Sequence, residues 1–173
     1  KTATSPNIIG LVAEDQSPDF FPMYGDKTVS LPHLEALAKD GITFNNAYAP
    51  VPVCAPARSS LITGMYPTSL GTHNMRTYNA YREENQPSIG IPSYSPLVPE
   101  NIRMFTEYLR AAGYYCTNNA KEDYNFKKVA SAWDESSKTA HWKNRAPDQA
   151  FFAVFNFNSA HESQIWGQAD QPL

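Results

Sequence analysis

The side chains best suited to chemistry in this chain lie around one cysteine. Cys54 precedes Pro56 by two positions and Arg58 by four, within the string CAPARSSLITG that ends at Gly64. Proline suits the first turn of a helix, so Cys54 is predicted at or just before a helix N-terminus. Free backbone N–H groups and the positive end of the helix dipole would favour an anion beside the thiol. Arg58, about one turn further on, would add a fixed charge at the same place.

Further polar groups follow apolar runs that predict strands. Glu14 and Asp15 come directly after one such run, and carboxylates are the ligands that a hard cation such as calcium prefers. Lys121 follows a second run and can act as a point charge. His161 follows a third run and can transfer a proton. Taken alone, each of these residues would be an ordinary loop, capping or surface group, so the interpretation depends on their being gathered at one site.

The strands that would position these groups are predicted from hydrophobic runs. Residues 7–13 form a near-continuous apolar run, which predicts a central strand buried on both faces of a parallel sheet. Residues 151–157 predict another buried strand. Two more strands are expected over residues 42–48 and 114–118.

Helices are predicted between these strands, over residues 32–40, 55–63 and 101–112, the first and the last of them followed by a glycine stop. Residues 64–100 have no periodicity and predict a long loop. The alternation indicates an α/β fold with a mostly parallel central sheet flanked by helices. Ligands bind such sheets at the carboxyl ends of the strands, where the polar groups above are expected.

Composition limits the class of partner. The chain has 173 residues, the size of one ordinary domain, with 14 Lys plus Arg against 17 Asp plus Glu and a formal charge of −3. This balance gives no general attraction to nucleic acid or anionic membrane, and no apolar run approaches the length that crosses a bilayer. Neither partner is expected. Two cysteines cannot build a disulfide framework, and Cys116, inside a predicted strand, is assigned to the core.

The string over residues 54–64 resembles the signature of the sulfatase family, in which Cys-x-Pro-x-Arg also directs oxidation of the cysteine to formylglycine. The similarity is close over the first third of the chain and looser up to His161. It implies an alkaline-phosphatase-like fold, with residues 1–173 as the N-terminal part of the catalytic domain. The other matching segments are PNI at residues 6–8, ED at 14–15, LPHLE at 31–35 and GITFNNAY at 41–48.

The resemblance implies a two-step hydrolysis. One hydroxyl of the hydrated aldehyde at residue 54 attacks sulfur, and the other later expels sulfate as the aldehyde reforms. Cys54, Arg58, Lys121 and His161 would be the catalytic residues, with Lys121 on the sulfate and His161 as proton donor to the leaving group.

The same resemblance implies a calcium site made by Glu14, Asp15 and the modified Cys54. The family usually has two aspartates where this chain has Glu14 and Asp15. Many members also have a histidine two residues after the active-site lysine, where this chain has Asp123.

His73 and Arg76 are candidates to shape the substrate pocket. The segments around Asp123 and His161 look like those of bacterial glycan sulfatases, including heparan N-sulfatases, so the expected substrate is a sulfated carbohydrate with sulfate ester or sulfamate groups. Expected partners are a formylglycine-generating or sulfatase-maturating enzyme and a C-terminal remainder that supplies an Asp-Asn pair and a further lysine. A secreted or periplasmic location is expected from the resemblance.

Two alternatives remain open. The same fold can carry a phosphomonoester or phosphonate ester hydrolase, and relative rates on matched esters separate the two activities. The departures at Glu14 and Asp123 are also compatible with a non-catalytic protein that binds sulfated glycans. Turnover, as opposed to binding, decides that question.

Overall fold

The computed structural model describes residues 5–75 and 95–164 of the chain. The backbone forms two compact units. The sheet unit comprises residues 1–12 and 50–156, and the second unit comprises residues 13–49 and 157–173.

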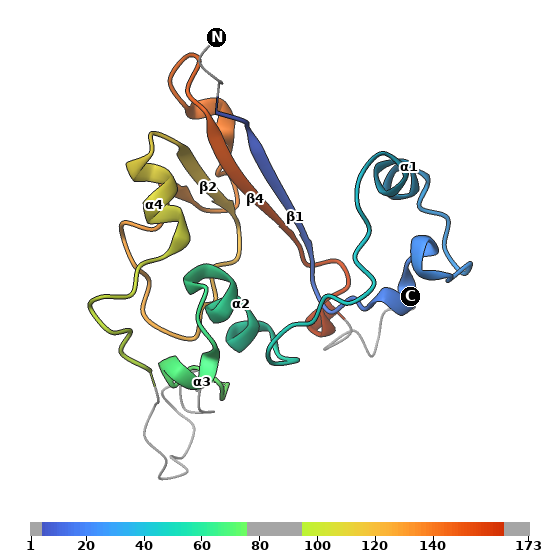
Figure 1. The fold of residues 1–173 in the computed structure, drawn as a ribbon, viewed down its shortest axis with the longest axis horizontal. Coiled ribbons are helices and arrows are strands. Elements are labelled where there is room, and N and C mark those ends of the chain that lie inside the picture. The colour runs from blue at the N-terminus through green and yellow to red at the C-terminus, as the bar shows by residue number, and fades with distance from the viewer. Residues whose placement is uncertain (1–4, 76–94, 165–173) are drawn as a thin grey trace. The chain divides into compact units, whose positions relative to one another are not determined.

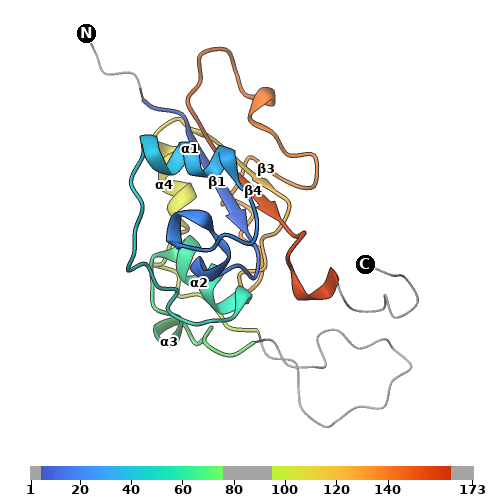
Figure 2. The same cartoon turned by 90° about the vertical axis from the view of Figure 1, so that its right-hand side faces the viewer.

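The sheet unit is built on four strands in the order β1-β4-β2-β3. β2 pairs in parallel with both neighbours, so that Thr117 lies opposite Ala153 on one side and Glu135 on the other. The arrows of β1 and β4 point the same way in Figures 1 and 2, so the carboxyl ends of the strands share one edge of the sheet. The strands are β1 (Ile8–Ala13), β4 (Phe151–Phe157), β2 (Tyr115–Asn119) and β3 (Glu135–Ser136).

Two helices, α2 (Cys54–Thr63) and α4 (Phe105–Ala111), lie over the same face of this sheet (Figure 1). They enclose a cavity of about 200 Å³ against β1 and β4. The rings of Phe105 and Phe152 meet edge to face at 5.2 Å, which is a favoured aromatic geometry. The buried core of the unit is made by Ile62, Met104, Tyr114, Cys116, Tyr124, Ala132 and Trp133.

Cys116 is fully buried in β2, which confirms its assignment to the core. Burial raises the pKa of its thiol to about 12, with the nearby carboxylate of Asp134 as a second cause. The sheet unit also contains the short helix α3 (Pro67–Leu70) and a 3-10 turn, η4 (Trp142–Asn144).

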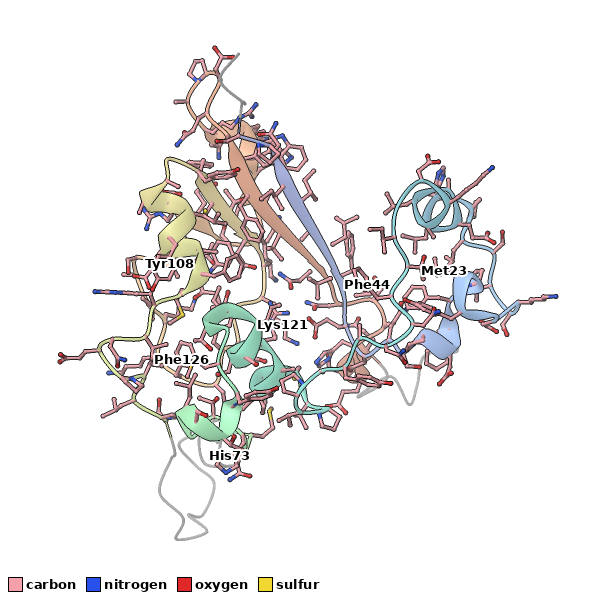
Figure 3. All side chains as sticks on the ribbon, in the orientation of Figure 1. Met23, Phe44, His73, Tyr108, Lys121 and Phe126 are labelled. Carbon is pink, nitrogen blue, oxygen red and sulfur yellow. The ribbon has the colours of Figure 1, made fainter. Side chains whose placement is uncertain are left out.

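The second unit is made of short helices and loops. Its one α-helix among the described residues is α1 (Pro32–Asp40). The Tyr24 hydroxyl donates to the carbonyl of Phe44 at 2.8 Å, which ties η2 (Pro22–Tyr24) to the segment after α1. Phe44 and Met23 line an apolar hollow of about 470 Å³ (Figure 3). The 3-10 helices of this unit are η1 (Pro18–Phe20), η2 (Pro22–Tyr24) and η5 (Glu162–Gln164).

The α/β fold with a parallel sheet is as predicted. The strands expected over residues 7–13, 114–118 and 151–157 and the helices over 32–40 and 55–63 agree with the structure to within one residue at each end. In the described residues no helix is both long and apolar enough to cross a membrane.

The strand predicted over residues 42–48 is wrong. This segment is irregular, and Ile42, Phe44 and Tyr48 are 82%, 66% and 84% exposed. Its aromatic and β-branched residues suit a strand, but a strand also needs a neighbour to complete its hydrogen bonds. The helix predicted over 101–112 begins only at Phe105, because the Glu107 carboxylate accepts the N–H of Met104 at 2.8 Å and caps the helix there.

The prediction that the first strand is central and buried on both faces is also wrong for the described residues. β1 lies at one edge of the four-stranded sheet, and Ile9 and Leu11 are 50% and 59% exposed. An apolar run predicts that a segment forms a strand, but it does not predict whether that strand lies at the centre or at the edge of the sheet, because the strand order is set by the chain topology. The two-residue strand β3 was not predicted, since it is too short and too polar to show a period.

Candidate active site

Cys54 is the first residue of α2, within the sheet unit. The N–H of Ala57 donates to the carbonyl of Val53 at 3.0 Å and closes the first helical turn. Pro56 lies within that turn, where its missing N–H removes no helical hydrogen bond. The helix ends at Gly64, whose φ of 68° is the left-handed conformation that favours glycine. The Cys54 thiol is half-buried and forms no disulfide, so a free cysteine stands at a helix N-terminus as predicted.

Arg58 is buried, with only 7% of its surface exposed. Its Nε donates to the carbonyl of Glu122 at 3.0 Å, and its Nη2 donates to the carbonyl of Lys121. Nη2 also donates to Oδ1 of Asn156 at 2.9 Å. Arg58 therefore joins α2, the turn after β2 and the end of β4. Its observed role as a brace for the segment that carries Lys121 was not predicted.

Lys121 is half-buried and lies two residues after the end of β2, next to α2 in Figure 3. Because two carbonyls of its own turn accept from Arg58, the position of the lysine backbone depends on that arginine. The structure thus brings Cys54, Arg58 and the Lys121 backbone together within one unit. Backbone N–H groups at a helix N-terminus suit an anion, and Arg58 and Lys121 add positive charge to the same unit.

Three polar residues that were not predicted from the sequence extend the hydrogen-bond network of Arg58. Nδ2 of Asn156 donates to Oδ1 of Asn118 and to the carbonyl of Asn119, both at 3.0 Å. Nδ2 of Asn118 reaches the hydroxyl of Ser136 at 3.1 Å. The available signal was an asparagine inside an otherwise apolar strand, since a polar group there costs free energy unless it has partners.

His73 lies in an exposed turn near α3 (Figure 3). The side chain of Asn125 donates to the carbonyls of Thr72 and Asn74, so the His73 turn is held against the loop that begins with Lys121. Asn125 adopts a left-handed φ of 63°, which asparagine tolerates better than most residues. Arg76, the other candidate pocket residue, lies outside the described residues.

The remaining predicted site residues belong to the second unit, where β1 and β4 end. The N–H of Glu14 donates to the carbonyl of Phe157 at 3.1 Å. Asp15 has a left-handed φ of 52°, and its Oδ2 accepts the N–H of Glu162 at 2.9 Å. Glu162 follows His161 in sequence, so Asp15 and His161 are held near each other. This grouping joins two segments that are almost 150 residues apart.

The imidazole of His161 is oriented by Ser163. Its Nδ1 accepts the N–H of Ser163 at 3.2 Å and lies 2.8 Å from the same residue's hydroxyl. A backbone N–H can only donate, so Nδ1 carries no proton in this arrangement. Nε2 is therefore the nitrogen that holds and exchanges the proton.

A metal site was predicted at Glu14, Asp15 and Cys54. Residues 5–75 and 95–164 contain no group of three His, Cys, Asp or Glu side chains close enough to hold a metal ion. Glu14 is 5% exposed and follows the end of β1, and Asp15 is the next residue, so two carboxylates that suit a hard cation are adjacent in sequence. The three-residue site stays a prediction.

The chain matches the sulfatase family over residues 6–170. It is 51% identical to an ulvan-active sulfatase of Formosa agariphila over 166 residues, which are 96% of this chain and 27% of that protein. It therefore spans about a quarter of that relative's length.

Solved structures share the fold at lower identity. A structure of a protein in complex with its substrate D-glucosamine-2-N,6-O-disulfate has a TM-score of 0.68 at 18% identity, over 91% of this chain and 35% of that one. The phosphonate monoester hydrolase of Agrobacterium radiobacter has a TM-score of 0.53 at 20% identity, over 92% and 27%. These likenesses show the alkaline-phosphatase-like fold, and the match over residues 6–170 shows that the chain belongs to the sulfatase family.

Proposed function

We propose that this chain is the N-terminal part of a sulfatase catalytic domain that hydrolyses sulfate groups on a sulfated polysaccharide. The observation that carries the proposal is the arrangement on α2: a cysteine at the helix N-terminus, followed about one turn later by the buried Arg58, which is bonded to the Lys121 turn. Formylglycine at position 54 would supply a hydrated aldehyde, whose hydroxyl is the nucleophile toward sulfur.

The residues of the sheet unit favour negative charge at that position. The first turn of α2 has backbone N–H groups without helical partners, and the helix dipole adds partial positive charge. Arg58 and Lys121 contribute two full charges. Charges that are fixed in place before the reaction stabilise the charge that develops on the sulfate oxygens in the transition state.

His161 is proposed as the proton donor to the leaving group. The contact of its Nδ1 with Ser163 leaves Nε2 to exchange the proton. Proton transfer to the departing oxygen matters most for a poor leaving group such as a sugar hydroxyl.

Glu14 and Asp15 are proposed to hold a calcium ion together with residue 54 and ligands from the rest of the full-length protein. When bound, such an ion offsets the negative charge of the sulfate and the nucleophile. Carboxylates that bind metal ions are usually oriented by a hydrogen bond, and Asp15 has one, because its Oδ2 accepts the N–H of Glu162.

A sulfated polysaccharide is proposed as substrate because the similar protein of Formosa agariphila is described as active on ulvan. A polymer of this kind is met outside the cytoplasm, so we also propose a secreted or periplasmic enzyme. Maturation would require a formylglycine-generating or sulfatase-maturating enzyme as partner.

The test uses full-length protein produced with and without a formylglycine-generating enzyme. Peptide mass spectrometry measures the aldehyde at position 54, and ion chromatography measures sulfate released from ulvan and from glucosamine disulfate. We expect sulfate release to rise in proportion to the aldehyde content, to vanish in Cys54→Ala and to persist in Cys116→Ala. Thiol-bearing protein that turns over as fast as the aldehyde form would contradict the proposal.

A matched pair of substrates separates the related activity on phosphorus. Rates on a phenyl sulfate and on the corresponding phenyl phosphonate are compared at equal aldehyde content. Preference for the phosphonate would assign the site to the phosphonate ester hydrolases that share the fold. Tight binding of sulfated glycan without turnover by the aldehyde form would assign it to a glycan-binding protein.

A further inference from the structure

Arg58 is part of a closed ring of hydrogen bonds in the sheet unit, which we call the Arg58 ring. It leads from Arg58 through the side chains of Asn156, Asn118 and Ser136 to Glu122. It closes because the carbonyl of Glu122 accepts from Nε of Arg58 at 3.0 Å. The ring therefore links α2, β4, β2, β3 and the turn after β2.

The direction of every hydrogen bond in the first half of the ring is fixed by chemistry. A guanidinium only donates, so the oxygen of the Asn156 carboxamide must face Arg58. The amide nitrogen of Asn156 then faces the carbonyl of Asn119, which only accepts, and Oδ1 of Asn118.

The second half of the ring follows the same direction. Asn118 accepts through Oδ1, so its nitrogen donates to the Ser136 hydroxyl. That hydroxyl donates to Oε1 of Glu122 at 2.7 Å, and Lys128 supplies a cation to the same oxygen at 3.0 Å. Hydrogen bonds aligned in one direction polarise and strengthen one another, more so where water is excluded. Asn118 is 1% exposed and the Glu122 side chain 9% exposed, whereas Ser136 between them is half-buried, so most of this part of the ring is shielded from water.

Asn156 is the member of the ring that meets Arg58. Among protein side chains of its size, only a carboxamide can accept from a guanidinium on one side and donate to two oxygens on the other. Strand pairing does not require a polar side chain at this position of β4, because backbone hydrogen bonds make the pairing and the other side chains of the strand are apolar.

We propose that Asn156 is a positioning residue for hydrolysis. It fixes the plane of the Arg58 guanidinium, and Arg58 in turn fixes the carbonyls of Lys121 and Glu122 and hence the place of the Lys121 backbone. A misplacement of about 1 Å of groups that contact the transition state can cost on the order of 100-fold in rate. The inference rests on the proposed sulfate hydrolysis.

The experiment uses full-length, aldehyde-bearing protein and two substitutions. Asn156→Leu removes both sides of the carboxamide, whereas Asn156→Asp keeps the acceptor toward Arg58 and removes the donors. We expect kcat per aldehyde to fall by about 10- to 100-fold in Asn156→Leu, with KM changed by less than about threefold. The kcat per aldehyde of Asn156→Asp is expected to fall by a similar factor, although aspartate has the same shape as asparagine and strengthens the contact with Arg58.

Asn119→Ala is the matched control. The Asn119 side chain also donates two hydrogen bonds at the end of β2, to the carbonyls of Lys138 and Ala140 at 3.0 and 3.3 Å, and takes no part in the ring. This variant keeps the Asn119 carbonyl that Asn156 uses. Its kcat per aldehyde is expected within about twofold of wild type, even if its thermal stability falls as far as that of the Asn156 variants.

Coupling separates positioning from general stability. Ser136→Ala opens the ring far from residue 54 and is expected to lower kcat by a few-fold on its own. In an Asn156→Leu background the ring is already open, so Ser136→Ala should have almost no further effect on kcat.

The outcomes distinguish the two proposals. If wild-type aldehyde-bearing protein releases no sulfate, both the proposed function and the role of Asn156 are wrong. Active wild type with an unchanged kcat in folded Asn156→Leu removes the role of Asn156 alone. If Asn156→Leu does not fold, a wild-type kcat in Asn156→Asp overturns the role in the same way. If Asn156→Leu folds, fully additive losses of kcat in the double variant with Ser136→Ala also overturn it.

Discussion

The two units hold their candidate catalytic groups in different ways. In the sheet unit, Arg58 is buried and its guanidinium is bonded to three groups from two other segments. In the second unit, Asp15 and His161 accept hydrogen bonds from backbone N–H groups of Glu162 and Ser163 in η5.

This difference predicts how each group responds to substitution. A buried cation in a network couples chemistry to folding, so removing it changes both the rate and the stability. A side chain held by a single backbone N–H near the surface can be exchanged with less damage to the fold. Substitutions of Asp15 and His161 should therefore affect rate or metal binding and leave the free energy of unfolding almost unchanged.

The largest effect is expected from Arg58→Lys. Lysine keeps the charge but cannot donate to three acceptors from a planar fork, so the turn at Lys121 loses its brace. We expect kcat per aldehyde to fall by about 100- to 1000-fold. The free energy of unfolding should fall by about 1.5 to 3 kcal/mol, measured by urea titration.

Arg110→Lys is the control for this prediction. Arg110 also bridges segments, through Asp134 at 2.8 Å and the carbonyl of Ser131, but it lies on α4 away from Cys54. Its replacement should lower stability and leave kcat near wild type. Equal losses of rate in the two variants would mean that the Arg58 effect is only structural.

The next effect is expected from His161→Ala. With a natural glycan, kcat should fall by about 100-fold because no group protonates the sugar oxygen as it leaves. With 4-nitrophenyl sulfate, whose leaving group needs no proton, the loss should be less than about tenfold. His141→Ala is the control, since the His141 ring packs against the Trp142 ring in the sheet unit, with 4.0 Å between centroids, and has no proposed role. A loss that is independent of the leaving group would remove His161 as proton donor.

Asp15→Asn should act on metal binding. The new amide keeps an oxygen that can accept the N–H of Glu162, so the loop is preserved while one negative charge is lost. Calcium affinity of the full-length protein, measured by isothermal titration calorimetry, should fall by about 10-fold or more. Asp19→Asn, an exposed residue bonded to Ser17, should bind calcium like wild type. Unchanged affinity in Asp15→Asn would exclude Asp15 as a ligand.

The smallest effect concerns Cys116 and leaves activity untouched. In protein made without the maturation enzyme, iodoacetamide at pH 8 should label the half-buried Cys54 and spare Cys116, whose pKa is raised to about 12 by burial. In the unfolded chain this thiol ionises near its ordinary pKa of 9.0, so the free energy of unfolding should decline as pH rises from 9 to 12. Labelling of Cys116 in native protein, read by peptide mass spectrometry, would contradict its core position.

The sequence predicted those elements whose signals are local. Pro56 and Gly64 mark the start and end of α2, and the apolar runs of β1 and β4 mark strands, so the place of Cys54 at a helix N-terminus followed from its neighbours. The segment over residues 42–48 has an equally good local pattern and is irregular, because pairing depends on which segment lies beside it.

The contacts of Arg58 could not be predicted for the same reason. Asn156 lies 98 positions away in sequence, and Asn118 and Ser136 come from two further strands that are brought together only by the parallel sheet. Each of these residues looks unremarkable in its own segment. The sequence predicted Arg58 as a site residue but contained no local sign of which groups it contacts.

The strand order also determines when the sheet can form during synthesis of the chain. Phe151 at the start of β4 bonds to Asn7 before β1, a separation of 144 residues, so the sheet beneath α2 is completed only when the end of β4 has been synthesised. About 100 residues lie between Cys54 and that point, which takes roughly 5 to 20 s at the usual speed of translation. During this interval α2 has no sheet to pack on, and the string around Cys54 is open. An enzyme that oxidises this cysteine, as proposed, has those seconds in which its target is still an accessible peptide.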